Sequence, residues 1–251
     1  MKKINVIGRL TADVETRTTQ SGGVINSFTL ATNKGYGDKA HPLFMGVTFF
    51  NDIPTKMKLK KGYSVVVSGE LRQNEYTNKD GNKVTNYVVI GENIEYAPSC
   101  SSNAMTPVVL IGRLSQEIST NDANTAGHTS IAIDDGFGEN KKTNFFRLHL
   151  YGNVLERLLK ATSASESNGK GTAIMIKGDF DSQDFTRKDG SAGKQYFINV
   201  EDFSLVSYGK KTSDTDENAK APATAPSAEE VPSAEQLAEE FDLDIDDDLP
   251  F

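Results

Sequence analysis

The chain has one cysteine, three histidines and no run of 18 apolar residues among its 251 residues. The single cysteine, Cys100, excludes an internal disulfide and a cysteine-based metal cluster, which fits a reducing compartment. The histidines, His41, His128 and His149, are scattered, and no Walker loop, nucleophile motif or HExxH helix accompanies them. The apolar run at the start ends at Arg9, too early for a signal-peptide core. We therefore expect a soluble, cytosolic, non-enzymatic protein with no metal or cofactor.

Acidic charge is concentrated at one end of the chain. Residues 209–251 carry 3 Lys against 13 Asp or Glu, a net charge of −10, which leaves +2 for residues 1–208. The acidic segment is rich in Ala, Pro, Ser and Thr and has too few apolar residues to offset the entropy of ordering, so we expect disorder there. The electrostatic potential at a binding surface depends mainly on the charges of its own domain. The overall pI near 5.0 therefore does not exclude an anionic partner for residues 1–208.

Residues 1–208 contain one unit twice. The segment NVIGRL at Asn5–Leu10 recurs as VLIGRL at Val109–Leu114, and YTNKDG at Tyr76–Gly81 recurs as FTRKDG at Phe185–Gly190. The offset between the copies grows from 104 to 109, and we place the extra residues in a surface loop at 162–171.

Each copy predicts a small β-barrel. In the first copy the β-rich runs are 4–10, 24–34, 43–51, 63–77 and 84–96, and residues 52–62 suit a short helix that stops at Gly62. Five strands with a helix between the third and fourth describe an OB-fold. An immunoglobulin-like sandwich needs about seven strands and no such helix.

The predicted fold is therefore all-β, with two tandem OB-fold barrels and a disordered acidic C-terminal tail. The predicted boundaries are 1–97 for the first domain, 98–106 for the linker between domains, 107–208 for the second domain, 209–240 for a disordered linker and 241–251 for an acidic tip.

Strand parity separates a core face from a ring-bearing face in the third strand of each copy, because successive side chains alternate sides. Met45, Val47 and Phe49 form the core stripe of the first copy, as Phe146, Leu148 and Leu150 do in the second. The opposite face carries two aromatic rings in each copy, accompanied in the second by basic side chains: Phe44, Phe50, Phe145, Arg147, His149 and Tyr151. Bases stack on rings and cations follow phosphates, so this face suits single-stranded nucleic acid.

These residues resemble the bacterial single-stranded DNA-binding protein family over both barrels and the tail. The family pattern places a stacking aromatic at four positions per domain, and all eight are aromatic here, although the family often uses Trp and this chain has none. The candidate nucleic-acid-binding residues are Tyr36, Phe44, Phe50, Arg72, Tyr76, Lys34, Lys39, Lys79, Phe137, Phe145, Arg147, His149, Tyr151, Phe185, Arg187 and Lys188. Asp181 replaces the counterpart of Arg72, which predicts unequal affinities of the two copies.

The resemblance also implies partners and an assembly. Family members with two OB domains per chain act as dimers, so the implied assembly is a homodimer that presents four OB domains to single-stranded DNA. In the family a DDDIPF-like end docks into basic, apolar-lined pockets on replication, recombination and repair proteins, and the matching partner-binding residues here are Asp246, Asp247, Asp248, Leu249, Pro250 and Phe251. A calcium-binding EF-hand loop starting at Asp242 is excluded, because its position 6 would be Asp247 rather than the required Gly.

Two alternatives stay open. An OB-fold nuclease would need carboxylates clustered near the strands, for which Asp134, Asp135, Asp179 and Asp181 are the candidates. An RNA-binding or primosome-type OB protein would share the fold, but the acidic tip disfavours it. The resemblance implies a nucleoid-associated cytoplasmic protein that protects single-stranded DNA.

Overall fold

The computed structural model describes residues 1–77, 83–97, 104–136, 141–163, 169–186, 190 and 192–206, with only the backbone described at 76, 77, 83 and 84. These residues belong to one compact unit, Met1–Tyr208. The predicted tail 209–251 and most of the predicted linker 98–106 lie outside the described residues.

The first barrel is a closed sheet of five strands with one short strand added at its edge. The strands are β1 (Lys2–Leu10), β2 (Glu15–Thr18), β3 (Val24–Lys34), β4 (His41–Phe49), β5 (Ser64–Thr77) and β6 (Lys83–Tyr96). Antiparallel pairs join β1 to β3, β3 to β4, β5 to β6 and β1 to β5, and a parallel pair of β4 with β6 closes the barrel. This is the predicted OB topology. Sequence reasoning missed β2, whose four residues are all exposed and leave no apolar pattern.

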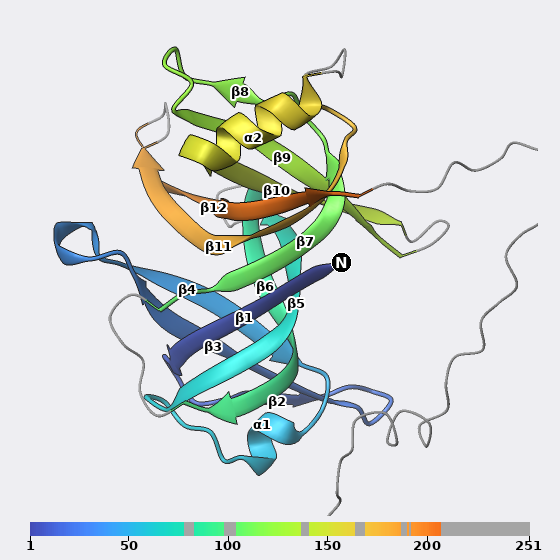
Figure 1. The fold of residues 1–251 in the computed structure, drawn as a ribbon. Coiled ribbons are helices and arrows are strands. Elements are labelled where there is room, and N and C mark those ends of the chain that lie inside the picture. The colour runs from blue at the N-terminus through green and yellow to red at the C-terminus, as the bar shows by residue number, and fades with distance from the viewer. Residues whose placement is uncertain are drawn as a thin grey trace, which may run out of the picture. The chain divides into compact units, whose positions relative to one another are not determined.

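The second barrel repeats this order. Its strands are β7 (Pro107–Leu114), β8 (Ser119–Thr120), β9 (Ala126–Asp135), β10 (Lys142–Tyr151), β11 (Ala173–Thr186) and β12 (Ala192–Leu205). Strand β7 pairs with β9 and β11, and β10 runs parallel to β12, as their counterparts do in the first barrel (Figure 1). The expectation of two OB-fold barrels is confirmed.

The helices between the third and fourth barrel strands differ in length. Helix α1 (Ile53–Lys56) has 4 residues, whereas α2 (Gly152–Thr162) has 11. The helix predicted over 52–62 is therefore shorter than expected, because the backbone of Lys58 turns into the left-handed region at φ 53° before Gly62 is reached. The extra residues of the second copy lengthen its helix as well as the loop that follows it. Within the described ranges, neither α-helix is long or apolar enough to cross a bilayer.

The core follows the predicted strand parity. Met45, Val47 and Phe49 are buried, and so are Phe146, Leu148 and Leu150 in the second barrel. Their neighbours in sequence point outward, because consecutive side chains of a strand take opposite sides. The buried stripe thus determines which side chains β4 and β10 present to solvent.

Side chains and backbone connect the barrels. Strands β1 and β7, side by side in Figure 1, form an antiparallel pair in which Ile4 is opposite Val108. Away from this pair, His41 Nε2 lies 2.8 Å from Asp181 Oδ1 of the second barrel. Burial lowers the pKa of His41, but hydrogen bonds to the Lys39 carbonyl and to Asp181 outweigh it and raise the pKa above its ordinary value.

The raised pKa of His41 predicts a pH dependence of folding stability. A group with a raised folded pKa contributes stability that is complete below its unfolded pKa, about 6.5, and that is lost as pH rises through the folded value. We expect His41→Gln to cost no more than about 1 kcal/mol, because the His41 side chain is 38% exposed and water screens its interaction with Asp181, and to cost it at pH 5.5 but not at pH 8.5. Thermal unfolding of both proteins at the two pH values measures this. Equal losses at both pH values would contradict it.

Candidate nucleic-acid interface

The predicted rings that the structure describes all lie on the surface. Tyr36, two residues after β3, is 73% exposed. The ring on β4, the ring just after β4 and the three of the second barrel are 44–62% exposed: Phe44, Phe50, Phe145, Tyr151 and Phe185. Phe137 and the side chain of Tyr76 lie outside the description. The outward direction that strand parity predicted for Phe44, Phe50, Phe145 and Tyr151 agrees with their exposure, while the binding role of all six described rings stays a prediction.

The predicted cations that the structure describes differ in exposure. Arg147, Arg72 and Lys39 are exposed, although Arg72 lies 3.3 Å from Glu70. Lys34, named as a candidate binding residue, is not available on the surface. Lys34 ends β3 with its side chain 2% exposed, and its Nζ lies 2.7 Å from both carboxylate oxygens of Asp179 in the second barrel. Lys79, Arg187 and Lys188 lie outside the described residues.

His149 contributes a ring rather than a charge. It is half-buried on β10 and stacks on Phe197 with ring centroids 4.2 Å apart and planes 13° apart. Burial lowers its pKa, and the positive charge of Arg147 and the neighbouring His128 lower it further. The imidazole is therefore neutral at neutral pH, in an aromatic surface next to the Arg147 guanidinium.

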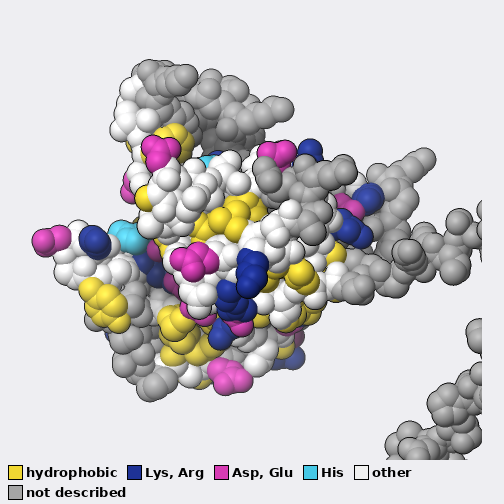
Figure 2. Space-filling view, turned by 45° about the horizontal axis from the view of Figure 1, so that its top comes forward, with side chains coloured by type: hydrophobic (Ala, Val, Ile, Leu, Met, Phe, Trp, Pro, Cys, Tyr) yellow, Lys and Arg dark blue, Asp and Glu magenta, His cyan; other side chains and the backbone are white. Residues whose placement is uncertain are grey.

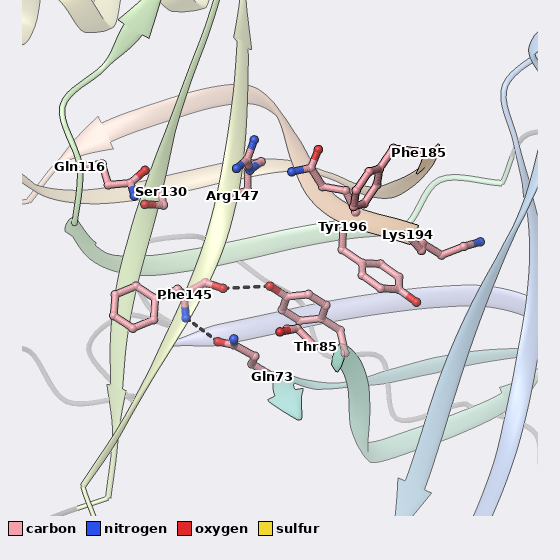
Figure 3. Close-up of a pocket in the computed structure, with 11 residues that line it drawn as sticks. Gln73, Thr85, Gln116, Ser130, Phe145, Arg147, Phe185, Lys194 and Tyr196 are labelled. Carbon is pink, nitrogen blue, oxygen red and sulfur yellow. Dashed lines mark hydrogen bonds between the residues drawn. The ribbon is translucent and has the colours of Figure 1, made fainter. Parts of the chain in front are cut away.

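A cavity of about 390 Å³ lies where the two barrels meet, and Figure 3 shows the residues that line it. From the second barrel come Phe145, Arg147 and Phe185, all predicted site residues, together with Tyr196. From the first barrel come polar side chains, among them Gln73 on β5. The cavity therefore brings predicted site residues of one barrel next to the polar surface of the other.

The first barrel holds the Phe145 backbone from two sides. The amide of Phe145 donates to Gln73 Oε1 at 2.8 Å, and Tyr87 on β6 donates its hydroxyl to the Phe145 carbonyl at 2.9 Å (dashed lines in Figure 3). Burial, reinforced by the negative charge of Glu75, raises the pKa of Tyr87 to about 12, so this donor keeps its proton. Sequence reasoning missed Gln73 and Tyr87. The repeat held a signal for Tyr87, because its counterpart is Tyr196 and the two rings pack 5.3 Å apart.

The acidic residues named as nuclease candidates have structural partners. Asp179 pairs with Lys34, Asp181 with His41, Asp134 with Lys141, and Asp135 with Lys2. Among the described residues, no group of three or more His, Cys, Asp or Glu side chains is arranged to hold a metal ion. These carboxylates therefore give the nuclease alternative no structural support.

The face shown in Figure 2 has several separate patches of hydrophobic side chains with Lys and Arg between them. Separate hydrophobic patches with charged side chains between them differ from the continuous apolar patch that marks many protein–protein interfaces. It is the combination that single-stranded nucleic acid recognition uses.

Two closed five-stranded barrels in one chain, each with an outward row of rings, define an OB-fold protein with two domains. Residues 1–97 match the model described as the single-strand binding protein family. Single-stranded DNA-binding protein 2 of Staphylococcus aureus is 32% identical over 96 residues, which cover 36% of this chain and 68% of the relative. The chain belongs to the single-strand binding protein family, in a form with two OB domains.

Two further comparisons extend beyond the first barrel. A single-stranded DNA-binding protein of Fusobacterium nucleatum is 25% identical over 142 residues, which cover 54% of this chain and 92% of the relative. The crystal structure of the wild-type single-stranded DNA binding protein from Thermus aquaticus matches with a TM-score of 0.59 at 20% identity, covering 85% of this chain and 96% of that one. At this identity the second likeness shows the fold, and it includes both barrels.

Proposed function

We propose that this chain binds single-stranded DNA without base preference and without catalysing a reaction. The observation that supports this most strongly is the recurrence of exposed rings at counterpart positions, Phe44 with Phe145 and Phe50 with Tyr151. An exposed ring loses most of the free energy that its burial would contribute. Matching exposed rings in both barrels are therefore explained best by a ligand that covers them.

The proposed path of the strand runs from one barrel to the other through the cavity between them. Phe145 and Phe185 stack bases there, and Arg147 contacts a phosphate, while Gln73 of the first barrel lies within the same cavity. Each stacked base contributes roughly 1–3 kcal/mol irrespective of its identity, because every base has a π-face. Phosphate contacts add a term that weakens as salt concentration rises.

In the cell, this activity would protect single-stranded DNA during replication, recombination and repair, in the cytoplasm at the nucleoid. A homodimer would present four OB domains, around which the strand winds. The predicted acidic tip, Asp246–Phe251, would recruit partner enzymes: its carboxylates suit a basic rim, and the Phe251 ring suits an apolar pocket. These proposals rest on the family and on the sequence of the tail.

Removal of one counterpart pair of rings tests the DNA-binding surface. We expect Phe44→Ala combined with Phe145→Ala to weaken binding of oligo-dT by at least about 30-fold, since two lost stacks are worth at least about 2 kcal/mol. Fluorescence anisotropy at fixed salt concentration measures the affinity. The matched control is Tyr63→Ala, which removes a 43% exposed ring outside the proposed path and should leave affinity unchanged.

Wild-type affinity in the double variant would refute the assignment of these rings. Titration of the unchanged protein with matched RNA and with duplex DNA tests the substrate class. Comparable binding to all three would contradict a role specific to single-stranded DNA.

Deletion of Phe251 tests whether the tip is a separate binding surface. We expect oligo-dT affinity to stay at the wild-type value and capture of replication and repair proteins in a pull-down to be lost, because the ring that fills the partner's pocket is gone. The matched control is Leu237→Ala, which removes an apolar side chain from the tail upstream of the tip. Equal capture by the deletion variant and the wild type would exclude the tip as the docking site.

A further inference from the structure

The two barrels meet as two subunits of a symmetric dimer do. In the β1–β7 pair, Ile4 lies opposite Val108, and the repeat that aligns Asn5–Leu10 with Val109–Leu114 makes Val108 the counterpart of Ile4. A residue that pairs with its own counterpart is the mark of an isologous, two-fold contact. Backbone pairing alone would therefore join the first barrel equally well to a second copy of itself.

One end of this pair carries a buried lysine between two partly exposed acids, whose side chains are 26% and 32% exposed. Lys2 on β1 is 3% exposed; its Nζ lies 3.0 Å from Glu70 on β5 and also contacts Asp135 on β9 of the second barrel. Burial alone would raise the pKa of Glu70, but hydrogen bonds from Lys2 and Arg72 outweigh it and lower the pKa below its ordinary value. We name these three residues, Lys2, Glu70 and Asp135, the first charge cluster.

The counterpart positions at the other end form a second charge cluster, Thr106, Asp179 and Lys34. Lys34 is 2% exposed and lies 2.7 Å from Asp179 on β11. The amide of Thr106 donates to Asp179 Oδ1 at 2.6 Å, and its hydroxyl lies 3.2 Å from the same oxygen.

The two clusters occupy the same three positions with different charges. In the repeat, Thr106 is the counterpart of Lys2, and Asp179 is the counterpart of Glu70. The strand registers make Asp135 the counterpart of Lys34, because Arg9 pairs with Ala31 in the first barrel as Arg113 pairs with Ala132 in the second. The position supplied by the neighbouring barrel is thus an acid in the first cluster and a lysine in the second.

Pairing of like barrels would mismatch these charges. A first barrel paired with a copy of itself would bring Lys34 of one copy against Lys2 of the other, so that two lysines would share Glu70. A second barrel paired with a copy of itself would bring Asp135 against Asp179 with Thr106 and no cation between them. Two lysines whose side chains are each 2% exposed would face each other in the first case, which is strongly unfavourable, and two partly exposed carboxylates would repel each other in the second.

We propose that the charge signs of the two clusters, each built on a buried lysine, determine which barrel pairs with which: the β1 surface accepts a barrel of the second kind and rejects a second copy of the first. Backbone pairing supplies the contact, and the two clusters supply its specificity. This charge pattern ensures that the cavity between the barrels is always lined by one barrel of each kind. It holds whether or not the chain binds DNA.

An exchange of two side chains tests this, Lys34→Asp together with Asp135→Lys, which leaves composition and net charge unchanged. In this swap variant both native clusters are mismatched. Pairing of like barrels, in contrast, restores both sets of charges. Between two first barrels, Lys2 and Glu70 meet the new aspartate at position 34, and between two second barrels, Thr106 and Asp179 meet the new lysine at position 135. The proposal therefore predicts that the swap variant stays folded and pairs like with like between chains.

Cysteine pairs report the pairing in full chains in which Cys100 is replaced by Ser. Lys3 lies opposite Val109, so Lys3→Cys with Val109→Cys gives a thiol crosslink within one chain in the native pairing. Because Asn5 is the counterpart of Val109, Lys3→Cys with Asn5→Cys gives a crosslink between two chains in the pairing of first barrels. We expect the wild type to form only the first crosslink and the swap variant to form the second at the expense of the first.

Two further variants separate charge sign from other effects. The exposed pair of Arg157 and Asp202, 3.1 Å apart, is exchanged as Arg157→Asp with Asp202→Arg and should keep the crosslink within one chain. Lys34→Met with Asp179→Asn removes an ion pair but leaves no buried charge of the wrong sign, and should keep it too. Loss of the crosslink in this neutral variant would show that pairing depends on the bond rather than on the sign pattern.

The proposal is overturned if the swap variant keeps the crosslink within one chain at wild-type yield. It is also overturned if circular dichroism shows the swap variant unfolded, because pairing of like barrels should then have supplied a matched alternative. Light scattering of the swap variant, which should show a larger mass than the wild type, provides an independent reading of the same outcome.

Discussion

A charge that leaves water must meet an opposite charge, and at the junction of the two barrels this requirement determines the arrangement of the described residues. The β1–β7 backbone pair is short and nearly two-fold symmetric, so it carries little information about which surfaces it joins. Lys2 and Lys34, both almost fully buried, remove that ambiguity. With the barrels held in this way, Gln73 and Tyr87 of one barrel position the Phe145 backbone of the other.

The two barrels have retained their cores and diverged on their surfaces. The buried stripes of β4 and β10 are equivalent, and the rings beside them recur. In contrast, Gly46 has Arg147 as its counterpart, and Arg72 has Asp181, which is occupied by His41. Among the described residues that line the cavity, the second barrel thus supplies the cations Arg147 and Lys194 and the first supplies none, while the first has an exposed arginine on β5. Each barrel supplies a different part of one composite surface.

Much of the fold could be predicted because alternating apolar residues in strands report burial directly. The five runs of the first copy correspond to β1, β3, β4, β5 and β6, and the outward direction of Phe44, Phe50, Phe145 and Tyr151 follows from parity alone. The prediction was wrong for Lys34 because its partner, Asp179, is 145 residues away, and no local pattern distinguishes a buried ion pair from a solvated lysine. Gln73 and Tyr87 were missed for the same reason, since their roles arise only where the two barrels meet.

The placement of Lys2 also bears on synthesis of the chain. The first barrel is complete before the second is made, because its five strands all precede residue 97. At that stage the start of β1, residues 2–4, is an uncovered strand edge, the kind of edge that recruits other chains into aggregates. Lysines at positions 2 and 3 disfavour such pairing until β7 covers the edge. Lys2, buried at the junction of the finished chain, is thus also one of the charges on the open β1 edge of a first barrel without its partner.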